Sequence, residues 1–177
     1  MASPGGTGQA DVERTDDGRY IVVGGRRWRA TDPHIPERLR SELVAELMDA
    51  RRAVKAGGRD ADAVVAARGR VQDAKVALGE RGDPWWGPPS DAGLRARARA
   101  AILALLSKRG TTSSICPSDA ARISASPDWR PAMPVVRDVA ADLARAGRIV
   151  VTQGDRVVRE LGDVTGAIRL RLPREGG

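Results

Sequence analysis

The chain has 177 residues, a formal net charge of +7 and a single cysteine. This length suits one domain or two small ones, one cysteine excludes an intramolecular disulfide, and no apolar run of about 18 residues indicates a transmembrane helix. The first residues have neither a basic start nor an apolar stretch, so they do not resemble a secretory signal. We therefore expect a soluble, cytoplasmic protein.

The whole net positive charge lies in the second half of the chain. Residues 1–92 contain 15 Lys and Arg against 15 Asp and Glu, whereas residues 93–177 contain 15 against 8. A neutral part followed by a basic part is expected if only the second part meets a polyanion. A GC-rich coding sequence produces the same arginine-rich composition without such a partner, so the charge alone leaves both explanations open.

The first half is predicted to be a β-hairpin followed by a helical hairpin. Residues 1–17 are small and polar with an acidic end, which predicts a disordered tail. Residues 20–29 are predicted to form the β-hairpin, because Gly24-Gly25 suits its two-residue turn. Apolar residues at helical spacing from Glu37 to Leu78, interrupted at Gly57-Gly58, predict two antiparallel helices. These elements make a first module at 18–86.

Three tryptophans accompany this module. The apolar stripe of its second helix is thin and contains two alanines, so Trp28 and the Trp85-Trp86 pair are predicted to cover it. Alternatively, the same tryptophans form an exposed patch that binds a protein partner or a second copy of the chain.

The second half follows the element order of a winged helix. Residues 87–92 read as a linker of Gly, Pro and Ser, and residues 93–177 as the domain. The pattern predicts a long helix, a short helix, a third helix and β-strands, at 94–109, 117–123, 133–146, 148–153, 156–158 and 167–172. The predicted fold class is therefore α+β, with an N-terminal β-hairpin and helical hairpin followed by a C-terminal winged-helix domain.

Short motifs in this half carry a family resemblance. Ile115-Cys116-Pro117-Ser118, Asp128-Trp129-Arg130 and Gly147-Arg148-Ile149 resemble a bacterial domain family of unknown function, number 3253 in that series, over roughly residues 93–172. The resemblance implies a small winged-helix domain and no established activity. The first half, around Arg27-Trp28-Arg29 and Trp85-Trp86, is similar to an actinobacterial leader module sometimes labelled Tol-like. No membrane segment or long repeat supports transport.

The function predicted from these patterns is non-enzymatic DNA binding. A winged helix most often presents its third helix and its hairpin to DNA. The candidate contacts are arginines, because a guanidinium suits both phosphate oxygens and guanine edges. They are Arg130, Arg137, Arg148, Arg156 and Arg159. Asp138 and Asp142 on the third helix oppose phosphates, so backbone binding of double-stranded DNA is favoured over base reading.

Two other functions stay open at this stage. A protein-interaction or scaffold module would use the tryptophans and the acidic residues of the third helix. A redox-responsive regulator would use Cys116, which precedes Pro117 at a predicted helix N-terminus, a position that favours the thiolate; a small buried residue is the plainer interpretation. With one cysteine and one histidine, His34, no zinc site, cofactor site or catalytic dyad is predicted.

Overall fold

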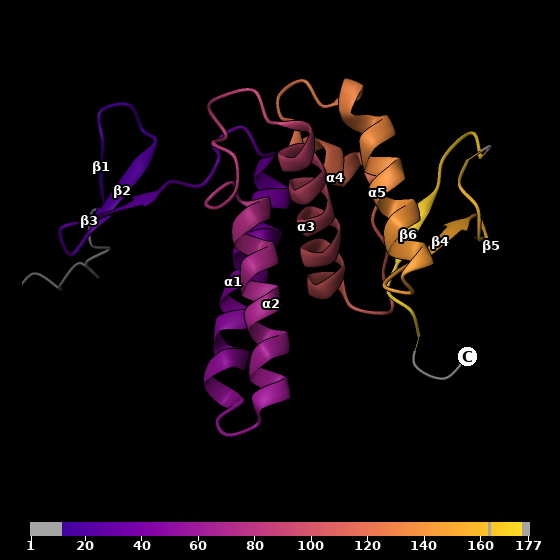
Figure 1. Ribbon diagram of the computed structural model, residues 1–177, viewed down its shortest axis with the longest axis horizontal. Coiled ribbons are helices and arrows are strands. Elements are labelled where there is room, and N and C mark those ends of the chain that lie inside the picture. Colours follow the sequence, from indigo (N-terminus) through magenta and orange to yellow (C-terminus); the bar gives the residue numbers. More distant parts are fainter. Residues whose placement is uncertain (1–11, 163, 175–177) are drawn as a thin grey trace, which may run out of the picture. The chain divides into compact units, whose positions relative to one another are not determined.

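The computed structural model describes residues 12–162 and 164–174. The chain forms two compact units, Met1–Ala30 and Thr31–Gly177, which we describe separately. Small β-sheets and five α-helices make up the described residues, so the predicted α+β class is confirmed (Figure 1). None of the helices in this part of the chain combines the length and hydropathy that crossing a membrane requires.

The first unit contains a three-stranded antiparallel sheet. Its strands are β1 (Glu13–Arg14), β2 (Tyr20–Val23) and β3 (Arg26–Arg29), in the order β1-β2-β3. The predicted hairpin is confirmed: Val23 pairs with Arg26, and Gly24 and Gly25 have the positive φ values, 58° and 73°, that its turn requires.

Part of the predicted disordered tail is ordered. Residues 12–17 include β1, which pairs along β2, and a turn in which the Thr15 hydroxyl accepts from the Tyr20 amide at 3.1 Å. The prediction failed there because the edge of β2 offers backbone partners even to a polar segment. Residues 1–11 of the predicted tail lie outside the described residues.

The five predicted helices lie in the second unit, at bounds close to those expected. They are α1 (Glu37–Ala56), α2 (Ala61–Ala77), α3 (Asp91–Arg109), α4 (Pro117–Ser124) and α5 (Met133–Arg145), with a 3₁₀ turn, η1 (Arg130–Ala132), before α5. Side-chain caps fix two of the starts: Asp60 accepts from the Ala63 amide and Ser90 from the Gly93 amide, each at 3.0 Å. The predicted linker at 87–92 lies inside this unit and its end belongs to α3.

A second antiparallel sheet follows α5. Its strands are β4 (Val150–Gln153), β5 (Arg156–Val158) and β6 (Arg169–Arg171), in the order β5-β4-β6. Gly154, with φ of 57°, forms the turn between β4 and β5. Ile115, in the segment between α3 and α4, adds an antiparallel bridge to Leu170 of β6. The sheet is thereby joined to the loop that precedes α4.

Helix α3 lies at the centre of the second unit. It contacts α1, α2, α4, α5 and β6, and all seven residues from Ala100 to Leu106 are buried. Its alanines let neighbouring helices approach closely, and α2 presents its own buried alanines, Ala67, Ala74 and Ala77. The thin stripe of α2 is therefore covered by helices. Trp28 belongs to the first unit, where it is 44% exposed, and its predicted role as a lid stays a prediction.

Buried and partly buried polar contacts join α1, α2 and α3. Glu46 of α1, which is 1% exposed, accepts from Arg70 of α2 at 2.7 and 3.0 Å and from the Ser107 hydroxyl of α3 at 2.7 Å. Near the end of α3, Arg109 donates to both carboxylate oxygens of Glu42, at 2.7 and 3.0 Å. This bidentate bond raises the pKa of Arg109. Specific polar contacts thus fix how α1 and α2 pack on α3.

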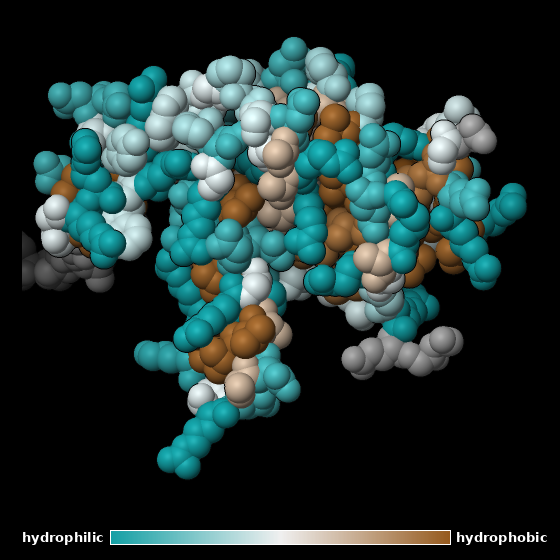
Figure 2. Space-filling view, in the orientation of Figure 1, coloured by the Kyte–Doolittle hydropathy of each residue, from teal (hydrophilic) through white to brown (hydrophobic). Residues whose placement is uncertain are grey.

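Apolar surface remains near the turn that joins α1 and α2 (Figure 2). On these helices Val44, Met48 and Val65 are exposed. Scattered exposed apolar residues are common on folded proteins, so this surface defines no site by itself.

Substitution of Arg70 tests the buried pair. Arg70→Ala leaves the Glu46 carboxylate buried and without its bidentate partner, so we expect the free energy of unfolding to fall by about 3 kcal/mol. Arg52→Ala, which removes an exposed ion pair to Asp49, should cost below about 1 kcal/mol. Urea denaturation of the two variants measures the difference, and equal losses would contradict the role given to Glu46.

Candidate functional site

Helix α5 is flanked by two hollows that contain arginines. Its buried face consists of Val136, Val139, Ala140 and Leu143, which pack into the core and leave the rest of the helix accessible. We call the hollow between α5 and residues 159–162 the β5-side hollow, of 730 Å³, and the one between α5 and α3 the α3-side hollow, of 410 Å³. We treat the side chains around these two hollows as the candidate site.

The β5-side hollow contains three arginines and two acids. Arg137 and Arg145 come from α5, and Arg159 comes from the segment after β5. Arg137 is half-buried and donates to the backbone carbonyl of Val164, a bond that uses one of its five N–H groups. The acids are Asp138 and Glu160. The hollow therefore has an excess of positive charge.

The α3-side hollow also contains three arginines, Arg95, Arg99 and Arg148. Asp142 of α5 lines this hollow too. It accepts from Arg95 at 2.7 Å and also pairs with Arg145 of the β5-side hollow. The charge of Asp142 is thereby shared by an arginine from each hollow.

Asp73 of α2 lies behind the α3-side hollow. It is 3.9 Å from Arg99 and also feels the charge of Arg148. Burial raises the pKa of Asp73, and the attraction of these two arginines opposes that rise. The positive field of the hollow therefore reaches a carboxyl group on the helical hairpin.

The structure separates the five arginines predicted from the sequence. Arg137 and Arg159 meet in the β5-side hollow, whereas Arg148 lies in the α3-side hollow. Arg156 is exposed on β5, and Arg130 lies in η1 with its guanidinium carbon 4.7 Å from the centroid of the Trp129 ring. The predicted set is thus distributed around α5 and does not form one cluster.

Three arginines of these hollows were not among the predicted site residues: Arg95, Arg99 and Arg145. Arg145 follows Arg137 by two helical turns, so its position on the same side of α5 could have been inferred. Arg95 and Arg99 lie one turn apart on α3, and their outward position was expected. Arg95 and Arg99 lie close to α5 because of how α3 packs against α5. The spacing of residues along the chain does not reveal this packing.

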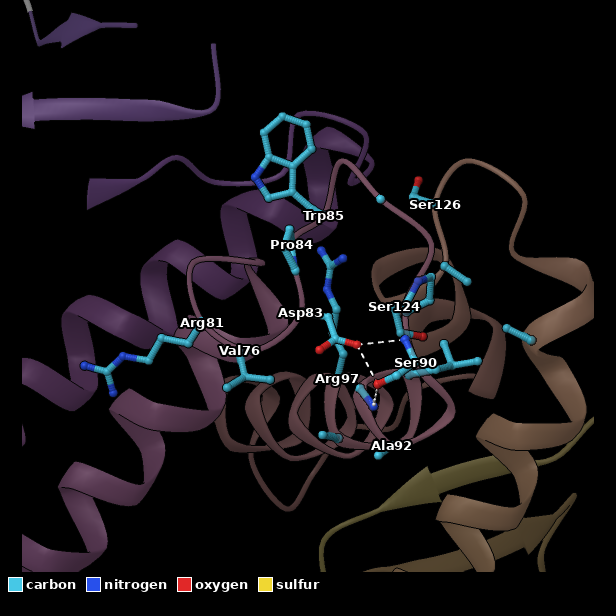
Figure 3. A pocket seen from close by; sticks show the side chains of 18 of the residues that line it. Val76, Arg81, Asp83, Pro84, Trp85, Ser90, Ala92, Arg97, Ser124 and Ser126 are labelled. Atoms are coloured by element: carbon cyan, nitrogen blue, oxygen red, sulfur yellow. Dashed lines mark hydrogen bonds between the residues drawn. The ribbon is translucent and has the colours of Figure 1, made fainter. Parts of the chain in front are cut away.

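A third hollow, of 620 Å³, lies at the N-terminal end of α3 beside Trp85 (Figure 3). Asp83 accepts from the amide and the hydroxyl of Ser90, at 2.8 and 2.7 Å. A Cβ at position 93 would lie 1.9 Å from the Asp83 carboxylate, so only glycine permits this approach.

Arg97 lines the same hollow and is largely buried. It donates to Asp32 at 2.8 Å and to the carbonyl of Ala77 at 3.2 Å. Burial lowers the pKa of Arg97, and the hydrogen bond to Asp32 opposes that change. Arg97 and Asp83 thus already have partners within the protein, and these contacts stabilise the packing of α3.

The tryptophans predicted as a patch belong to different units. Trp28 lies in the first unit, with the Arg26 guanidinium 4.8 Å from its ring centroid. Trp85 and Trp86 lie in the second unit, are half-buried and contact each other edge to face at 5.2 Å.

Cys116 and His34 have separate local partners. The half-buried Cys116 sulfur accepts from the Ser118 hydroxyl at 3.1 Å, at the start of α4. His34 is 3.0 Å from Asp32 and lies edge to face with Trp85. Across residues 12–162 and 164–174, no three His, Cys, Asp or Glu side chains are grouped so that they could hold a metal ion.

One family model matches part of the chain. Residues 95–173 match the model of a family described as a protein of unknown function (DUF3253), which confirms the resemblance found in the second half. The match begins inside α3 and leaves out α1 and α2. No curated protein matches the chain. The similarity of the first half to a Tol-like leader module stays a prediction.

The raised pKa of Asp73 predicts a pH effect. A carboxyl whose pKa is higher in the folded state is costly to ionise there, so its contribution to stability falls as pH rises from its ordinary pKa of 3.8 through the raised value. Asp73→Asn should therefore gain stability over wild type as pH increases through this window. Urea denaturation from about pH 3 to about pH 8 measures the difference. If the difference in free energy of unfolding between Asp73→Asn and wild type is the same at every pH, the raised pKa of Asp73 is contradicted.

Proposed function

We propose that the chain binds double-stranded DNA through α5 and the two hollows beside it, without catalysing a reaction. The observation that carries the proposal is that α5 lies between two hollows with three arginines each. DNA carries a dense row of negative phosphates, and arginines that replace its counterions supply most of the affinity of sequence-independent binding. This arrangement suits a helix that lies in a DNA groove, with one sugar-phosphate backbone facing each hollow.

The order of the elements supports a winged-helix interpretation. Helices α3, α4 and α5 are followed by β4, β5 and β6, and the segment before α4 pairs with β6 through Ile115. In this interpretation α5 is the helix that enters the major groove, which is about 12 Å wide, and the β4–β5 hairpin is the wing. The arginines of the two hollows then face the strands that border the groove.

The composition of α5 favours phosphate contacts over base contacts. It contains no Asn, Gln or Lys, and its charged residues are Arg137, Asp138, Asp142 and Arg145. A carboxylate accepts from cytosine but repels phosphates, and Asp142 is already paired with Arg95 and Arg145. We therefore propose that the arginines position the protein on the DNA backbone with little discrimination between sequences.

Salt-dependent binding tests this function. The full chain should bind a short DNA duplex at low salt, with an affinity that falls steeply as salt increases. Arg145→Ala combined with Arg159→Ala should weaken binding about tenfold or more and reduce the slope of log affinity against log salt by about 2. Fluorescence anisotropy of a labelled duplex measures both quantities.

Two variants serve as controls. Arg59→Ala removes one positive charge from the α1–α2 turn, away from α5, and should change affinity less than about twofold. Asp138→Asn removes a negative charge from the β5-side hollow and should strengthen binding about twofold or more. Absence of binding by the wild-type chain at low salt, or equal effects of Arg59 and the hollow arginines, would overturn the proposal.

A further inference from the structure

A group of two arginines and a tryptophan precedes α5. The guanidinium carbon of Arg122, in the last turn of α4, lies 4.6 Å from the ring centroid of Trp129. That of Arg130, in η1, lies 4.7 Å from the same centroid. Two cations, one from α4 and one from η1, therefore lie on the same aromatic ring. We call Arg122, Trp129 and Arg130 the Arg–Trp–Arg stack.

The charges around this stack leave it positive. Arg122 has one carboxylate nearby, that of Asp119 at 4.0 Å, and this buried carboxylate is also close to Arg38 and Arg109, at 3.7 and 3.6 Å. Asp128 adjoins Trp129 in the chain. Within the described part of the chain, no ion pair involves Arg130. The Arg130 charge is therefore available to an anion.

Stacking determines how these arginines can meet an anion. A guanidinium that lies over an indole uses its face for that contact and keeps its N–H groups directed outward in its plane. Trp129 is half-buried and packs against the hydrophobic core, so the ring is a fixed support. A side chain that is already ordered loses less conformational entropy when it binds, which favours the bound state.

We infer that the Arg–Trp–Arg stack is a preorganised phosphate-binding element that holds the DNA backbone at the beginning of α5. This inference rests on the proposed function. It adds Arg122, which belongs to α4, and it assigns Trp129 the role of a positioning residue that acts through the two arginines. The geometry of stacking, and not the positive charge alone, is what distinguishes this element from the arginines of the hollows.

Substitutions that keep the charge test this distinction in the full chain. Lysine retains the positive charge but lacks the planar group, so Arg122→Lys with Arg130→Lys should weaken binding to a labelled duplex about fivefold. The matched double variant, Arg145→Lys with Arg159→Lys, should change affinity less than about twofold, because those arginines act mainly by charge. The salt dependence of both double variants should stay close to that of wild type, since no charge is lost.

Variants of Trp129 provide a second readout. Trp129→Phe keeps an aromatic face and should retain affinity within about twofold, whereas Trp129→Leu should reproduce the loss seen with the two lysines. Thermal unfolding verifies that each variant is folded, and the lysine variants decide the outcome if Trp129→Leu is not. Wild-type binding that is insensitive to all these changes overturns the stack and leaves the proposed function standing. No binding by the wild-type chain overturns both.

Discussion

The burial of α3 on all sides is the constraint on which the second unit depends. From Ala100 to Leu106 every residue is buried, so this segment of the helix has no face available to solvent. Helices α1 and α2 supply part of its cover, and α4, α5 and β6 supply the rest. A helix at the edge of a domain needs only one buried apolar stripe. Helix α3 needs cover on both sides, from α1 and α2 and from α4, α5 and β6. The residues matched by the family of unknown function therefore share their core with residues that precede the match.

Polar contacts determine how the helices are oriented around α3, and the candidate site depends on this orientation. Burying a charge pair adds little net stability, but a buried carboxylate that loses its partner is strongly unfavourable, so alternative packings are excluded. Glu46 with Arg70 and Asp32 with Arg97 meet this condition. Because α3 is fixed, Arg95 and Arg99 are presented beside α5, and Asp142 pairs across to Arg95 at 2.7 Å. The hollows on both sides of α5 are consequences of packing that reaches back to α1.

Local signals predicted the elements better than their assembly. Helical spacing and the Gly24-Gly25 turn depend on neighbouring residues, and these elements were found where expected. An arginine on a helix ordinarily faces solvent, yet Asp32, 65 residues earlier, holds Arg97 in the interior. Pairing over such separations leaves no mark on local periodicity. For the same reason the sequence did not reveal that Arg137 and Arg148 line separate hollows on either side of α5.

The dependence of the matched region on the helical hairpin is tested most directly by comparing two fragments, residues 31–177 and residues 91–177. Two-dimensional ¹H–¹⁵N NMR spectra distinguish a uniquely packed core from a collapsed chain, which loses fixed side-chain signals. Residues 31–177 should give a dispersed spectrum. Residues 91–177, whose α3 would expose the face that α1 and α2 cover, should give a poorly dispersed one. A dispersed spectrum from residues 91–177, with the same peak positions for α4, α5 and the sheet, would contradict the account.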